Sequence, residues 1–178
     1  MKSNKLIVIF LIKFFGTYAL LFLMYSYYLK NTQKTGEVFA CSPITKTVAK
    51  QTVFILNNVG YNARVEQHTN EISMKLFVNN AYISRVIEGC NAISIIILFI
   101  SFIVAFSNKF VITALYILFG SLIIYFVNIV RIAIISIAYF EFPQYETILH
   151  DLVFPSIIYG ITFLLWFIWV RQFSNWKK

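Results

Sequence analysis

Four runs of apolar residues constrain the fold of this chain more than any other feature. They cover residues 6–29, 90–106, 110–140 and 152–170. A helix needs about 20 mostly apolar residues to cross the ~30 Å hydrocarbon layer of a membrane, so each run is a candidate span. The third run would be about 46 Å long as a helix, and its far end should therefore emerge from the bilayer.

The composition agrees with a membrane location. Of the 178 residues, 60% are hydrophobic and 12% are charged, which is too apolar for a soluble domain of this size. We predict an all-α integral membrane protein that forms one domain over residues 1–178. It has about four transmembrane helices and one polar extracytoplasmic segment between the first and the second.

That polar segment comprises residues 31–89. Partly apolar positions recur every three or four residues at Ile44, Val48, Thr52 and Ile55. This spacing predicts an amphipathic helix that lies on the membrane and ends at Gly60. The stretches "YNARVEQH", "ISMKLFV" and "AYISRVI" then alternate, with "TNE" and "NN" between them. This pattern is typical of strands and indicates a small meander.

The basic residues of the short segments predict the orientation, because cytoplasmic loops carry an excess of Lys and Arg. Basic residues lie near the N-terminus, in the turn after the second run, and after the fourth: Lys2, Lys5, Lys109, Arg171, Lys177 and Lys178. The 141–151 loop has only acidic charges. We therefore expect a multi-pass protein of the inner (cytoplasmic) membrane with both termini in the cytoplasm.

With this orientation, three reactive side chains fall at one depth. At ~1.5 Å per residue, Arg131 lies about 33 Å from Lys109, Cys90 about 27 Å from Asn108, and His150 about 32 Å from Arg171. All three are thus expected at the extracytoplasmic boundary. There they would form an active site outside the cytoplasm.

The chemistry of these three residues is complementary. Cys90 is a nucleophile whose thiolate is favoured at a helix N-terminus or beside a cation. His150 can take the thiol proton and return it to a leaving amine. Arg131 keeps its charge and can hold a developing oxyanion through its forked N–H donors. Together they predict acyl transfer.

Each residue also has a simpler explanation. Cys90 could be a small packing residue, Arg131 could extend toward lipid headgroups, and His150 could be an interfacial loop residue. Asn128, one helical turn before Arg131, is expected to satisfy hydrogen bonds of the backbone or of Arg131 rather than to react. We take it as a supporting residue.

Other chemistries find little support in the sequence. The net charge of +8 comes from scattered Lys and Arg, so nucleic acid is not an expected partner. No CxxC pair, HExxH signature or GxSxG elbow is present, and we expect neither cofactor nor metal. Cys41 and Cys90 could form one bridge, but it would remove the nucleophile, so we expect none.

Three motifs carry a resemblance to a known family. "VIEGCNAIS" opens the second run, "NIVRI" lies near the end of the third, and "LHD" begins the fourth. They resemble the Cys, Arg and His motifs of the exosortase and archaeosortase family, in the short four-span form of Bacteroidetes-type bacteria. Many members have Ser-Gly or Ala-Gly after the cysteine. Asn91 and Ala92 stand there in this chain, and we take Asn91 as a second supporting residue.

The resemblance implies a membrane cysteine transpeptidase. Such an enzyme would cut exported proteins that end in a sorting signal made of a short motif, a transmembrane helix and a basic cluster. It would pass the new C-terminus to a surface acceptor of unknown identity. A site at the outer boundary would meet the junction between an exported domain and its anchor helix.

Two alternatives remain open from the sequence. The chain could be a non-catalytic assembly or transport subunit, in which Arg131 pairs with Glu88, Glu141 or Asp151 and Cys90 only packs. It could also be a different intramembrane protease or acyltransferase. The first alternative predicts that Cys90→Ser would be harmless.

Overall fold

The computed structural model describes residues 2–34, 39–107 and 109–173, without the side chains of residues 2–4, 146, 150 and 154. The α-helices and strands of this part are α1 (Lys2–Thr32), α2 (Pro43–Asn58), β1 (Ala63–Gln67), β2 (Ser73–Val78), β3 (Ala81–Ile87), α3 (Ile93–Ala105), α4 (Phe110–Glu141), α5 (Glu146–Ile148) and α6 (Phe154–Ile168). The same part of the chain also contains short 3₁₀-helical and π-helical turns: η1 (Glu88–Cys90), η2 (Pro143–Tyr145), η3 (Leu149–Val153) and η4 (Trp169–Phe173).

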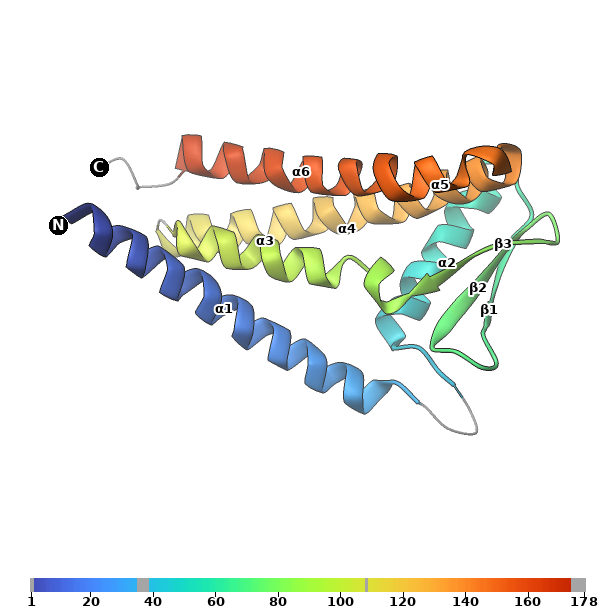
Figure 1. Cartoon of the computed structure of the whole chain (residues 1–178), viewed down its shortest axis with the longest axis horizontal. Helices are drawn as coiled ribbons and strands as arrows, with labels where there is room; N and C mark the ends of the chain where they lie inside the picture. Colours follow the sequence, from blue (N-terminus) through green and yellow to red (C-terminus); the bar gives the residue numbers. More distant parts are fainter. Residues whose placement is uncertain (1, 35–38, 108, 174–178) are drawn as a thin grey trace.

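The molecule's long axis is followed by the helices α1, α3, α4 and α6 (Figure 1). Helix α1 packs against α3, and α4 packs against both α3 and α6. The start of α1 and the end of α6 lie at the same end of the bundle, while α2 and the sheet lie at the other (Figure 1). This arrangement agrees with the prediction that the start of α1 and the end of α6 lie on the same side of a membrane.

Within the described residues, three helical segments are long and apolar enough to cross a membrane: Lys5–Thr32, Phe110–Glu141 and Asp151–Phe173. The fourth candidate, α3, is apolar but has only 13 residues. At ~1.5 Å per residue it extends about 20 Å, which is short of the hydrocarbon thickness. The helical membrane fold is therefore confirmed in outline, and the number of four spans stays a prediction.

The polar segment contains both the predicted helix and the predicted meander. The strands form an antiparallel sheet in the order β1-β2-β3. Asn79 and Asn80 both have positive φ in the tight turn between β2 and β3, as a two-residue hairpin requires. The description of the whole chain as all-α is thus incomplete, because these residues alternate with the period of a strand rather than a helix.

Helix α2 starts and ends as its sequence indicates, but its apolar stripe faces protein. Ser42 caps its N-terminus, Pro43 occupies the first turn, and Gly60 follows at φ 102°. Its buried residues include Val48, Ala49 and Leu56, and the helix contacts α4 and the sheet. The stripe therefore packs inside the molecule rather than against lipid.

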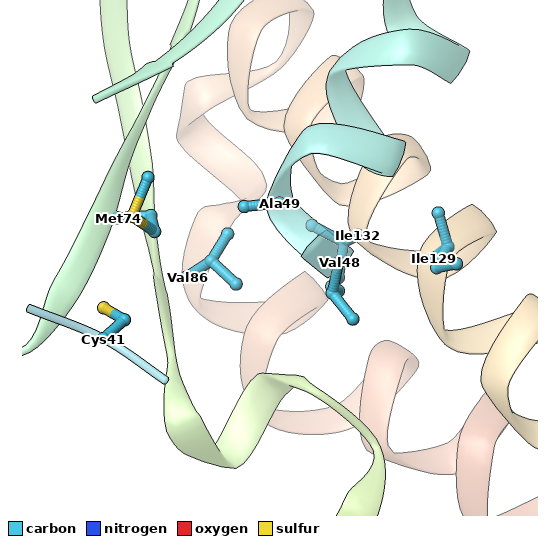
Figure 2. Close-up of a cluster of buried hydrophobic side chains, with 7 residues drawn as sticks. All are labelled: Cys41, Val48, Ala49, Met74, Val86, Ile129 and Ile132. Atoms are coloured by element: carbon cyan, nitrogen blue, oxygen red, sulfur yellow. The ribbon is translucent and has the colours of Figure 1, made fainter. Parts of the chain in front are cut away.

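A cluster of buried side chains joins the polar segment to the helices. Figure 2 shows it: Cys41, Val48, Ala49, Met74, Val86, Ile129 and Ile132. Ile129 and Ile132 come from α4, and the others from α2, from the sheet and from the residues that precede α2. This cluster fixes the end of the bundle where the chain passes from β3 into the turn that contains Cys90.

Helices α3 and α4 approach closely at Gly120. A Cβ placed there would overlap the end of the Phe99 ring, which is fully buried. We expect Gly120→Ala to destabilise the protein by about 1–3 kcal/mol, because the ring has little room to move. Gly160→Ala in α6, where nothing lies within 4 Å of the new Cβ, is the control. Unfolding in detergent micelles compares them, and equal stabilities would contradict this packing.

The predicted orientation can be tested with introduced cysteines. Ser107 and Gln144 are exposed and lie near opposite ends of α4. In a chain whose own cysteines are replaced by alanine, an impermeant maleimide should label a cysteine at position 144 in intact cells. A cysteine at position 107 should label only after the cells are opened. Labelling of position 107 in intact cells would reverse the orientation.

Candidate active site

Cys90 lies in the turn η1, between the end of β3 and the start of α3. Its backbone carbonyl accepts a hydrogen bond of 2.7 Å from Asn128 Nδ2 of α4. Its side chain is half-buried and packs against the cluster of Figure 2. The cysteine is therefore attached to α4 through the same asparagine that the sequence indicated as supporting.

The residues after Cys90 shape the entry into α3. Ala92 adopts a left-handed backbone conformation at φ 66°, which residues with a Cβ rarely adopt. Asn91 Oδ1 accepts a hydrogen bond of 3.0 Å from the Ile93 amide, one of the unpaired donors at the helix start. The buried Asn91 Nδ2 also donates to Tyr25 Oη at 2.7 Å and Thr45 Oγ1 at 3.0 Å. Asn91 thus connects this turn to α1 and α2.

Arg131 lies one helical turn after Asn128, the residue whose side chain binds the Cys90 carbonyl. Its Nε is buried and makes no hydrogen bond with the described part of the chain. The residue also lines an apolar cavity of about 120 Å³ between α4 and α6, with Ile134 and Ile157 among the other lining residues. The Nε donor of Arg131 therefore lies at a cavity near the cysteine without a partner among the described residues. The charge of this guanidinium is costly there unless another group binds it.

His150 belongs to η3, directly before α6, and its side chain lies outside the described residues. The α6 residue at the level of Arg131 is Ile157, which lines the same cavity. At ~1.5 Å per residue, the His150 backbone is about 10 Å further along the axis than Ile157. The structure thus places the Cys90 turn against α4 one helical turn from Arg131, and the convergence of the Cys90, Arg131 and His150 side chains stays a prediction.

Glu88, two residues before Cys90, was considered from the sequence only as a possible partner of Arg131. Its carboxylate instead accepts hydrogen bonds from the Ser42 amide at 2.7 Å and the Ser42 hydroxyl at 2.8 Å. It also accepts one from the Thr45 hydroxyl. Partial burial raises the pKa of this carboxyl, but hydrogen bonds from Thr45, Ser42 and Gln33 outweigh burial and hold the pKa below its usual value.

The described residues offer no group of three His, Cys, Asp or Glu side chains that could hold a metal ion. Glu141, another acid considered for Arg131, accepts a hydrogen bond of 3.2 Å from Tyr61 Oη. The polar groups that the structure places around the Cys90 turn include the Asn128 amide, the Asn91 amide and the Glu88 carboxylate.

Cys41 and Cys90 are both free thiols. Cys41 is buried in the cluster of Figure 2, and burial raises the pKa of its thiol, which disfavours the reactive thiolate. We expect no native disulfide between them, even on an oxidising side of the membrane. Mass spectrometry of the alkylated, non-reduced protein checks this, and a linked Cys41–Cys90 peptide as the main species would contradict a catalytic Cys90.

One comparison with known proteins identifies the family. A family described as transmembrane exosortase matches residues 7–170, which covers the polar segment, the Cys90 turn, Arg131 and the start of α6. No curated protein and no solved structure matches the chain significantly.

Proposed function

Because the chain belongs to the transmembrane exosortase family, we propose that it is a membrane cysteine transpeptidase that cleaves exported proteins within a C-terminal sorting signal. The observation that carries the proposal is the contact of α4 with the Cys90 turn. Asn128 Nδ2 donates to the Cys90 carbonyl, and Arg131 follows Asn128 by one helical turn on α4. This contact supports a site in which the Cys90 thiol and the Arg131 guanidinium act together.

In the first step, Cys90 Sγ attacks the carbonyl carbon of the scissile peptide bond. The C–N bond breaks, the new C-terminus is held on Cys90 as a thioester, and the thiol proton passes through His150 to the leaving amine. Arg131 stabilises the oxyanion of the intermediate, for which its unpaired Nε is available. The cleaved anchor helix remains in the bilayer.

In the second step, a nucleophile of the surface acceptor attacks the thioester. Its proton passes to His150, the bond between carbon and sulfur breaks, and the Cys90 thiol is restored. Water in the place of the acceptor would give hydrolysis. The same residues thus serve both steps.

The proposed site faces the exterior of the inner membrane, with both termini in the cytoplasm. This placement is supported by the basic residues at the opposite end of the bundle, such as Lys5, Lys109 and Arg171. The sorting signals of exported proteins place their cleavage motif on that outer side of their own anchor helix. Enzyme and substrate would therefore meet as two neighbours in the membrane.

The non-catalytic alternative needs an acidic partner for Arg131. Glu88 hydrogen bonds to Ser42, Thr45 and Asn91, and Glu141 hydrogen bonds to Tyr61. These contacts argue against Glu88 and Glu141 as that partner, and Asp151 stays a candidate for it.

Co-expression tests the proposal. The reporter is an exported protein whose C-terminal tail, from the genome that encodes this chain, contains a short motif, an apolar helix and a basic cluster. Cells with the native chain should convert the reporter to a shorter form that has lost the helix, and cells without it should not. An unchanged precursor with every such tail of that genome would contradict the proposed function.

A further inference from the structure

Besides its hydrogen bond to α4, the Cys90 turn is held by a network of buried and partly buried polar groups. We propose that Glu88 is a positioning residue of the active site, which fixes this turn against α1 and α2 and so sets the place of the Cys90 thiol beside Arg131. The inference rests on the proposed function, because it takes Cys90 as the nucleophile.

The contacts of Glu88 reach across the chain. Its Oε1 accepts from the Ser42 amide at 2.7 Å, and its Oε2 accepts from the Ser42 hydroxyl at 2.8 Å and from the Thr45 hydroxyl. Asn91 Nδ2 donates to the same Oε2 at 3.3 Å and, at 2.7 Å, to Tyr25 Oη of α1. One carboxylate therefore connects the residues on both sides of Cys90 with two other helices.

A carboxylate fits this set of partners better than an amide. Both of its oxygens accept hydrogen bonds, whereas a glutamine would turn its N–H₂ group toward either the Ser42 amide or Asn91 Nδ2, which can only donate. Ser42 is also the N-cap of α2, so the negative charge lies at the positive end of that helix. Ser42, Thr45 and Asn91 are all buried, so a lost acceptor could not readily be replaced by water.

The network affects the position of the thiol, because Cys90 lies between two attachments of the turn, one to α2 and one to α4. Glu88 and Asn91 hold the turn to α2, and Asn128 holds the Cys90 carbonyl to α4. If the attachment to α2 were lost, the thiol could shift relative to Arg131. A displacement of about 1 Å at a reacting group can cost about 10² in rate.

Glu88→Gln tests the inference, with Glu71→Gln as the matched control, since Glu71 forms an exposed ion pair with Arg85 on the sheet. For the purified protein, kcat and KM of reporter processing are measured with the amount of folded enzyme matched. In a Cys41→Ala background, the rate of Cys90 alkylation by a small neutral maleimide is also measured. We expect Glu88→Gln to lower kcat about 10- to 100-fold with KM unchanged and to alter the alkylation rate. Glu71→Gln should change neither.

A native kcat in folded Glu88→Gln would overturn the inference, as would a loss of activity that matches only the loss of folded protein. If Glu88→Gln does not accumulate, Thr45→Val removes one donor to the carboxylate at nearly constant volume. It should lower kcat less, and a native kcat would overturn the inference as well. If even the native chain leaves the reporter uncut, the proposed function fails. The role of Glu88 is then decided by the alkylation rates alone: equal rates of Cys90 alkylation in the native chain and in Glu88→Gln refute a positioning role.

Discussion

Cys90→Ala is expected to abolish processing of the sorting-signal reporter while the protein still inserts and accumulates. The substitution removes the only atom that can form the thioester, and the loss of a covalent nucleophile costs at least about 10³ in rate. Cys90 is half-buried in a short turn, so the loss of its sulfur should disturb the fold little. The measurement is the conversion of precursor to shortened product at matched enzyme levels.

Cys41→Ala is the control, because Cys41 is a thiol buried in the cluster of Figure 2 and should contribute packing alone. It should process the reporter near the native rate. His150→Ala should nearly abolish processing, since the thiol and the leaving amine would lose their proton carrier. Processing by Cys90→Ala at the native rate would leave Cys90 as a packing residue and favour the non-catalytic alternative.

Arg131→Lys is expected to insert normally and to lower processing about 10²- to 10³-fold, as the loss of one oxyanion donor typically does. Lysine keeps the positive charge but loses the planar fork of N–H donors. The chain offers a matched control in Arg171, which lies over the Phe167 ring near the end of α6. If an arginine serves only to reach lipid headgroups, lysine should replace it, so Arg171→Lys should be neutral.

The two substitutions are compared as initial rates of product formation in membranes that contain equal amounts of each variant. A native rate for Arg131→Lys would reduce this residue to an anchor. The mechanism would then lack the group that stabilises the oxyanion.

Much of the fold follows from local patterns in the sequence. The apolar runs predict α1, α4 and α6, and the alternation after Gly60 predicts the strands, with the Asn79–Asn80 turn between β2 and β3. Helix length along a common axis also predicted Cys90 and Arg131 at one depth, and the hydrogen bond from Asn128, one turn before Arg131, to the Cys90 carbonyl agrees with this. These properties depend on residue period and length, which a single sequence displays directly.

Contacts between distant segments were not predictable in the same way. Nothing local in "CSPIT" indicates that Ser42 and Thr45 bind Glu88, which follows more than 40 residues later. The amphipathic pattern of α2 showed an apolar face but not that α4 and the sheet would cover it. The positive φ of Ala92 had no signal either, because alanine does not favour that conformation.

The covalent intermediate on Cys90 tests the central claim most directly. The purified protein is mixed with the reporter in the absence of an acceptor and quenched in acid, and the peptide that contains Cys90 is analysed by mass spectrometry. The account predicts that this peptide gains the mass of the new C-terminal segment of the reporter and that hydroxylamine removes it, as it does a thioester. Formation of the shortened product while Cys90 stays unmodified, and while Cys90→Ala forms the product equally fast, would contradict it.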